Sequence, residues 1–127
     1  MRVQRVEGGF HQACAVALAG ALREAQQRGR EVSLALSGGS TVRPVFDALV
    51  ALAADSPGAE VSVDWGRVLI GQVDERVVPV GHPDRNAATL VEHLVAPLGI
   101  AEDRVRLLPV EAALDGKWLE QGAFGVA

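Results

Sequence analysis

The sequence predicts an α/β protein, a three-layer α/β/α sandwich around a mainly parallel, Rossmann-like open sheet in truncated form. Short apolar runs at 32–36, 68–73 and 105–108 have the length of buried strands. Segments with helical periodicity separate these runs. Strands joined through helices pair in parallel, because parallel neighbours need a crossover connection. With 127 residues, the chain suits a single domain over 1–127.

The N-terminal part predicts one helix and one strand. From Phe10 to Ala25, apolar residues recur at spacings of three and four, which is typical of an amphipathic helix, and Gly29 ends it. The run VSLAL at 32–36 is nearly continuous in apolar residues, so we expect a strand buried on both faces. SGGST follows at once, and helical periodicity then resumes.

The remaining elements follow the same alternation. A turn-rich stretch at 55–60 precedes the strand at 68–73. The loop DERVVPVGHPDRN leads to a helix over about 87–95, which we expect Asp84 or Asn86 to cap. Pro97 and Gly99 stop that helix.

Composition limits the classes of function. Hydrophobic residues make up 49% and aromatic residues only 4%, so the core must consist mainly of Ala, Val and Leu. The net charge of −4 and the absence of a basic block argue against nucleic-acid or anionic-membrane partners. No apolar run reaches the roughly 20 residues that cross a bilayer, and the start lacks a signal-peptide pattern. The single Cys14, a small core residue or a reactive thiol, fits a reducing compartment. We therefore expect a cytoplasmic protein.

The loop of Gly38, Gly39, Ser40 and Thr41 is a candidate anion site. It leaves a strand and enters a helix, whose free N–H groups and dipole attract anions. Glycines let the backbone approach a ligand, and the hydroxyls add donors. The other interpretation is an ordinary glycine-rich turn in which Thr41 caps the helix. The segment is neither a Walker A loop nor GxGxxG, so no nucleotide cofactor is indicated.

Two blocks resemble one known family. ALSGGSTVRPVFDAL is similar to the SGGSTPxxLYxxL pattern of 6-phosphogluconolactonases and glucosamine-6-phosphate deaminases, with Val42 in place of proline. VDERVVPVGHPDRNAATLVEHLV resembles their DERxVPxxHxxSN loop, with Arg85 in place of serine. The resemblance covers about residues 1–110, and the tail at 111–127 has no counterpart we can assign.

The resemblance implies a phosphate site and a set of roles. Gly38 to Thr41 would hold the 6-phosphate of the substrate, and Arg76 would add a charged contact. The alternative for Arg76 is a surface arginine paired with a neighbouring acid. Asp74 and Glu75 would support catalysis beside the sugar. His82 matches a histidine of the family loop, although a turn role in HPD is the simpler interpretation.

Arg76 favours the lactonase branch, because the deaminases tend to carry tyrosine there. The implied reaction is hydrolysis of 6-phospho-D-glucono-1,5-lactone to 6-phosphogluconate in the pentose phosphate pathway, without a cofactor. The catalytic histidine of the family lies in a GxDGHTAS motif, which this sequence does not contain. We therefore expect the chain alone to be weakly active or inactive.

Other roles remain open at this point. One alternative is a non-catalytic sugar-phosphate binding module. Another is an interaction protein whose exposed sheet edge pairs with a partner, a second copy of the chain included. Arg43 and Arg85 lie near the two loops, where we expect solvated surface positions. His11 and His93 are not convincing ligands or bases, and no Cys/His cluster indicates a metal.

Overall fold

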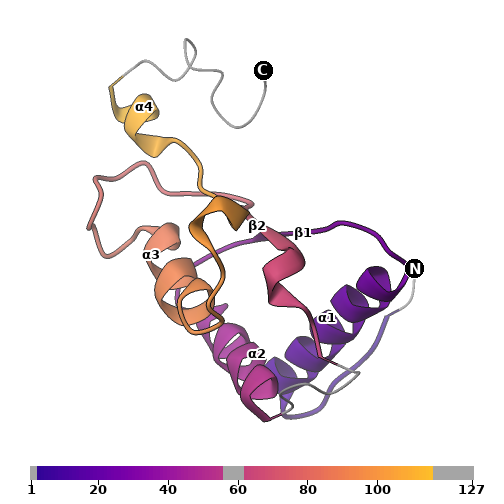
Figure 1. Ribbon diagram of the computed structural model, residues 1–127. Coiled ribbons are helices and arrows are strands. Elements are labelled where there is room, and N and C mark those ends of the chain that lie inside the picture. Colours follow the sequence, from indigo (N-terminus) through magenta and orange to yellow (C-terminus); the bar gives the residue numbers. More distant parts are fainter. Residues whose placement is uncertain (1–2, 56–61, 116–127) are drawn as a thin grey trace.

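The described part of the chain contains a three-stranded sheet in which every pair is parallel (Figure 1). A computed structural model describes residues 3–55 and 62–115. The strands are β1 (Val32–Leu36), β2 (Val68–Gln72) and β3 (Val105–Arg106), in the order β1-β2-β3. The predicted parallel α/β architecture is confirmed.

The register aligns the carboxyl ends of β1 and β2. Val32 lies opposite Val68 at one end, and Leu36 lies opposite Gln72 at the other. The pairing continues one residue further, because Val73 N–H donates to the Leu36 carbonyl at 3.0 Å. The segments that leave these two strands therefore start side by side.

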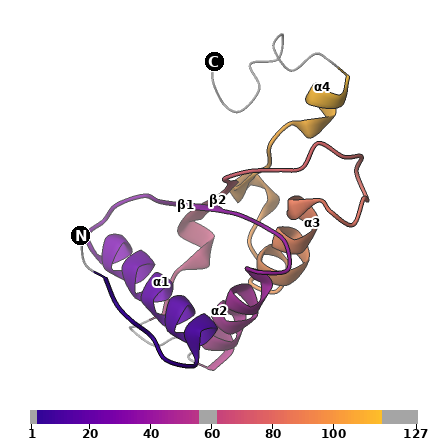
Figure 2. The ribbon, with the colours of Figure 1, turned by 180° about the vertical axis from the view of Figure 1, so that it is seen from behind.

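The first three helices lie on one side of the sheet, as the two opposite views show (Figure 1 and Figure 2). They are α1 (Phe10–Gln27), α2 (Arg43–Asp55) and α3 (Asn86–Leu90), and α3 continues as the π-helical turn η2 (Val91–Val95). Right-handed crossovers between strands in sequential order place α2 and α3 on the same face. The core between these helices and the sheet consists of Ala15, Phe46, Leu49, Val68, Ile70, Leu90, Leu94, Val95 and Ile100.

The opposite face of β1 is open to solvent. Val32 is buried, and Leu34 packs against the core, whereas Ser33 and Ala35 are exposed. The expectation that this strand is buried on both faces is therefore wrong for the described residues. The reason is the strand order, which gives both crossover helices to one face. The second helical layer of the predicted sandwich does not come from residues 3–55 and 62–115.

The first helix starts and ends near the expected residues, but its buried face is rotated. Ala15 and Leu22 are buried and Leu18 packs against the core, while Phe10 is 57% exposed. After the helix, Gly29 takes a positive φ of 72° and its N–H donates to Gln26 O. Gly29 therefore ends α1 as predicted.

Three short elements complete the described part. The 3-10 turns η1 (Trp65–Arg67) and η3 (Glu102–Arg104) lead into β2 and β3. The helix α4 (Val110–Leu114), which the sequence analysis did not predict, follows β3. Of the unassigned tail at 111–127, residues 116–127 lie outside the described residues.

Candidate functional site

The two sequence motifs meet at the carboxyl edge of the sheet. Ser37 follows β1 and Asp74 follows β2, and the Ser37 Oγ donates to Asp74 Oδ1 at 2.8 Å. This contact spans 37 positions of sequence. The expectation that SGGST and DER lie on one rim is therefore confirmed.

The glycine-rich loop is also packed against the start of α3. A Cβ on Gly38 would lie 2.5 Å from the Cβ of Asn86 and 2.6 Å from its Cα, so only glycine fits there. Asn86 in turn donates from Nδ2 to the Asp74 carbonyl at 3.4 Å. Gly39 has a φ of 91°, which a side chain would strain. The packing against Asn86 at Gly38 and the positive φ at Gly39 therefore both favour glycine.

The helix after this loop starts slightly later than a cap at Thr41 would require. Its first residue is Arg43, and the Val42 carbonyl accepts from Val45 N at 2.9 Å and Phe46 N at 3.2 Å. Val42, rather than Thr41, thus occupies the position before α2. Ser40 and Thr41 are exposed in the turn that leads into the helix. Their hydroxyls are accessible from solvent.

Arg76 is exposed on the neighbouring loop. Its backbone N–H donates to Glu75 Oε1 at 2.7 Å, which fixes the main chain at this point. Within 3–55 and 62–115, no acidic group lies within ion-pair distance of its guanidinium. The alternative of a surface arginine paired with a neighbouring acid has no support among these residues. Asp74 is likewise exposed, with Ser37 as its hydrogen-bond donor.

Glu75 is turned away from solvent, and its side chain is only 1% exposed. Its Oε1 accepts from Arg76 N and from Asn86 N, each at 2.7 Å. Its Oε2 accepts from Ala87 N at 2.8 Å and from Gln72 Nε2 at 2.9 Å. Burial alone would raise the pKa of this carboxyl, but the four hydrogen bonds outweigh it and lower the pKa below its ordinary value. Glu75 is a fixed anion.

The first turn of α3 is therefore capped by Glu75. Asn86 and Ala87 are its first residues, and both donate their backbone N–H groups to the Glu75 carboxylate. The expected cap, Asp84 or Asn86, is wrong. The Glu75 carboxylate, 11 residues before Asn86, provides the acceptor oxygen that a capping side chain would provide. It also places a negative charge at the positive end of the helix.

Arg85 is buried, at 8% exposure, and the expected solvated position is wrong. Its NH1 donates to the Val78 carbonyl at 3.0 Å, and its NH2 lies 3.1 Å from Glu111 Oε1 on α4. Its Nε lies 3.6 Å from Glu75 Oε2. Arg43, by contrast, is exposed as expected.

The contacts of His82 are those of a turn. Its backbone N–H donates to the Pro79 carbonyl, and its ring Nδ1 accepts from the backbone N–H of Asp84 at 3.1 Å. His93 lies away from the loops, half-buried, with Nδ1 3.6 Å from Asp47 Oδ1 of α2.

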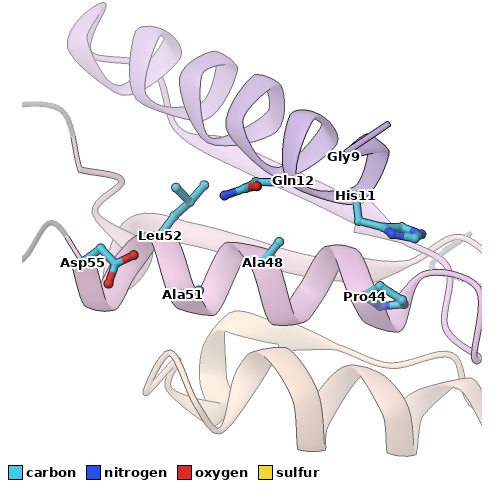
Figure 3. A pocket seen from close by; sticks show the side chains of 8 residues that line it. All are labelled: Gly9, His11, Gln12, Pro44, Ala48, Ala51, Leu52 and Asp55. Carbon is cyan, nitrogen blue, oxygen red and sulfur yellow. The ribbon is translucent and has the colours of Figure 1, made fainter. Parts of the chain in front are cut away.

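A groove of about 410 Å³ lies between α1 and α2 (Figure 3). His11 and Gln12 on α1 face Pro44 and Ala48 on α2 across it. None of the residues of SGGST or DER lines this groove. His11 therefore belongs to a different surface from the candidate site.

Two kinds of feature are absent from the described part of the chain. Residues 3–55 and 62–115 contain no group of three or more His, Cys, Asp and Glu side chains able to hold a metal. No helix in this same part of the chain is long and apolar enough to cross a bilayer.

Fold and site define a parallel α/β protein with a glycine-rich loop and an acidic–basic loop side by side at the carboxyl edge. The chain belongs to the family described as glucosamine-6-phosphate isomerases/6-phosphogluconolactonase, whose sequence model matches residues 7–123. The family resemblance inferred from the two motifs is thereby confirmed.

Individual relatives agree with the family. A 6-phosphogluconolactonase of Pseudomonas aeruginosa is 33% identical over 81 residues, which cover 64% of this chain and 30% of that protein. A solved 6-phosphogluconolactonase from Shewanella baltica is 26% identical with a TM-score of 0.65, over 95% of this chain and 50% of that one. The enzyme from Thermotoga maritima, at 22% identity and a TM-score of 0.67, shows the fold alone, over 91% and 49%. This chain thus spans half or less of the length of these relatives.

Proposed function

We propose that this chain binds the phosphate of a 6-phosphogluconate-type sugar and forms the phosphate-holding part of a 6-phosphogluconolactonase. The observation that carries the proposal is that the Gly38–Thr41 loop and the exposed Arg76 share one edge of the sheet, joined through Ser37 and Asp74. Exposed hydroxyls, an exposed guanidinium and the N-terminus of a 13-residue helix are suited to a phosphate. The names of the relatives supply the sugar, and the place in the pentose phosphate pathway is part of our proposal, taken from the resemblance of the two motifs to the family.

The same geometry supports anchoring more strongly than hydrolysis. Attack of water on the lactone carbonyl needs a base and stabilisation of the resulting oxyanion. The Glu75 carboxylate is saturated with donors and buried. The Nδ1 lone pair of His82 is used within its own turn. Asp74 is the accessible carboxylate of the two, and we assign it to ordering the sugar rather than to activating water.

We also propose a cytoplasmic protein that pairs with a second copy through its sheet edge. Among the described residues, strand β1 pairs only with β2 and therefore forms an edge of the sheet. An open edge favours pairing with another strand. Light scattering over a range of protein concentrations tests this, and a monomer at every concentration would contradict it.

Calorimetric titration with 6-phosphogluconate, and separately with inorganic phosphate, tests the proposed site. Arg76→Ala should weaken 6-phosphogluconate binding by roughly 1.5–3 kcal/mol, the scale of a charged hydrogen bond. Arg30→Ala is the matched control. Arg30 is also exposed, but it precedes β1 and therefore lies at the amino ends of the strands, away from the candidate site. Equal affinity of the wild type and Arg76→Ala would remove Arg76 from the site.

A further inference from the structure

Arg85 links three parts of the chain that are distant in sequence. Its guanidinium contacts the Val78 carbonyl in the DER loop, the buried Glu75 carboxylate and Glu111 on α4. The distances are 3.0 Å to Val78 O, 3.6 Å to Glu75 Oε2 and 3.1 Å to Glu111 Oε1. These contacts define a clamp, which consists of Glu75, Arg85 and Glu111.

The position of Arg85 is unfavourable for a cation without these partners. Its side chain is 9% exposed, and a buried charge is costly unless it is paired and hydrogen-bonded. It also directly precedes the N-terminus of α3, where the helix dipole repels positive charge. The two carboxylates and the Val78 carbonyl offset both effects. The orientation of Arg85 is therefore tied to the placement of its partners.

The clamp fixes the loop that carries the candidate phosphate ligand. Glu75 binds the backbone of Arg76 directly, so the place of its carboxylate sets the direction of the Arg76 main chain. Arg85 holds the same loop two residues beyond Arg76, at Val78. Gln72 lies just before the loop, at the end of β2; its Oε1 accepts from Leu108 N at 2.9 Å, and its Nε2 donates to Glu75. The segment after β3 thus contacts the last residue of β2, Gln72, and the end of the loop, Arg85.

We propose that Arg85 is a positioning residue, which holds Arg76 in its phosphate-binding orientation through Glu75 and Val78, while Glu111 on α4 orients Arg85. The proposal rests on the proposed function for the identity of the ligand. It goes beyond that function in making α4, which lies outside both sequence motifs, part of the machinery of the site. Arg85 acts through Arg76 and does not itself touch the phosphate.

The first test is a double-mutant cycle on 6-phosphogluconate affinity, measured by calorimetry. Glu111 is 54% exposed, so Glu111→Gln should fold and still remove the negative charge that orients Arg85. We expect it to weaken binding about three- to tenfold, as coupled neighbours do. In an Arg76→Ala background, the same change should weaken binding less than about twofold, because the residue it positions is gone. Glu102→Gln, at another exposed glutamate, is the matched control and should leave affinity unchanged.

The second test does not depend on any ligand. Hydrogen exchange of the Arg76, Asn86 and Ala87 amides, all of which donate to Glu75, is followed by NMR in the wild type and in Glu111→Gln. We expect these amides to exchange about tenfold faster in the variant, and the Ile70 amide of β2 to be unaffected.

The outcomes separate the two proposals. Unchanged exchange at the three amides overturns the positioning role, whatever the binding data show. An equal loss of affinity in both backgrounds of the cycle overturns it as well, since Glu111 would then act independently of Arg76. Faster exchange in a protein that does not bind 6-phosphogluconate supports the clamp and contradicts the proposed function.

Discussion

Gly38 lies so close to Asn86 that a Cβ on the glycine would stand 2.5 Å from the Asn86 carbonyl oxygen and 2.6 Å from its Cα. The atoms in conflict belong largely to the backbone at the first residue of α3, so no side-chain rotation relieves the contact. The glycine-rich loop and the loop of Asp74 and Arg76 are thus packed together at this point. The two loops can take this relative position because Gly38 has no side chain.

Gly38→Ala should therefore damage both stability and binding. Forcing α3 to move should lower the free energy of unfolding by about 1–3 kcal/mol, the usual cost of overpacking. It should also separate the loops and weaken 6-phosphogluconate binding. Urea denaturation and calorimetric titration measure the two effects.

Gly20→Ala provides the control for that prediction. Gly20 lies within α1, and a Cβ there would meet no atom within 4 Å. We expect this variant to be as stable as the wild type or more stable by about 0.5–1 kcal/mol, because alanine favours helices. If Gly38→Ala matched Gly20→Ala in stability, the close packing of the two loops would be disproved.

Glu75 should make the free energy of unfolding depend on pH. Its pKa is lowered in the folded protein, so ionised Glu75 contributes stability above the ordinary glutamate pKa of about 4.3. That contribution is lost as the pH falls through the lower folded value. Glu75→Gln should reduce the free energy of unfolding at neutral pH by roughly 1.5–3 kcal/mol, since the amide cannot accept all four hydrogen bonds.

Urea denaturation of both proteins from neutral pH down to about pH 3 tests this sign. The difference between wild type and Glu75→Gln should shrink toward the acid end, because the wild-type carboxyl is then becoming protonated. Glu102→Gln, at an exposed position, should change stability by less than about 0.5 kcal/mol. A difference that stays constant across the range would contradict an ionised, hydrogen-bonded Glu75.

Sequence reasoning located the two loops because each depends on local order. SGGST and DER each leave an apolar run, and parallel topology then places them at one edge, where Ser37 meets Asp74. The one-sided burial of β1 was not predictable in the same way. Alternation of strands and helices does not give the strand order, and it is the order β1-β2-β3 that leaves Ser33 exposed.

The inner contacts of the site were missed for a different reason. Rules for helix caps consider the residues just before the helix, but the cap of α3 is Glu75, 11 positions from Asn86. From its sequence context, Arg85 is expected at the surface. It is buried in the structure, where it contacts Glu111, which lies 26 positions away on a helix that was not predicted. The sequence offers one signal for this contact. The DER tripeptide lies in the loop that leads into α3, so its glutamate can reach the free N–H groups at the start of that helix.

The last prediction is that the protein hydrolyses 6-phosphogluconolactone little faster than buffer alone. The phosphate contacts that we propose for the Gly38–Thr41 loop and Arg76 would be nearly equal in the ground state and the transition state. Such uniform binding lowers KM and does not raise kcat. Residues 3–55 and 62–115 position no general base at this site, and the lack of one forfeits a further factor of about 10²–10⁴.

The lactone also hydrolyses spontaneously, so the rate must be compared with a blank that contains no protein. Asp74→Asn and His82→Ala decide which residue is responsible if the protein exceeds the blank. Loss of that excess in His82→Ala alone would mean that His82 leaves its turn, where Nδ1 accepts from Asp84 N, and acts as the base. Loss in Asp74→Asn alone would assign the base to the exposed carboxylate beside Ser37. Either result would contradict the prediction, because it would place a complete hydrolytic site within these 127 residues.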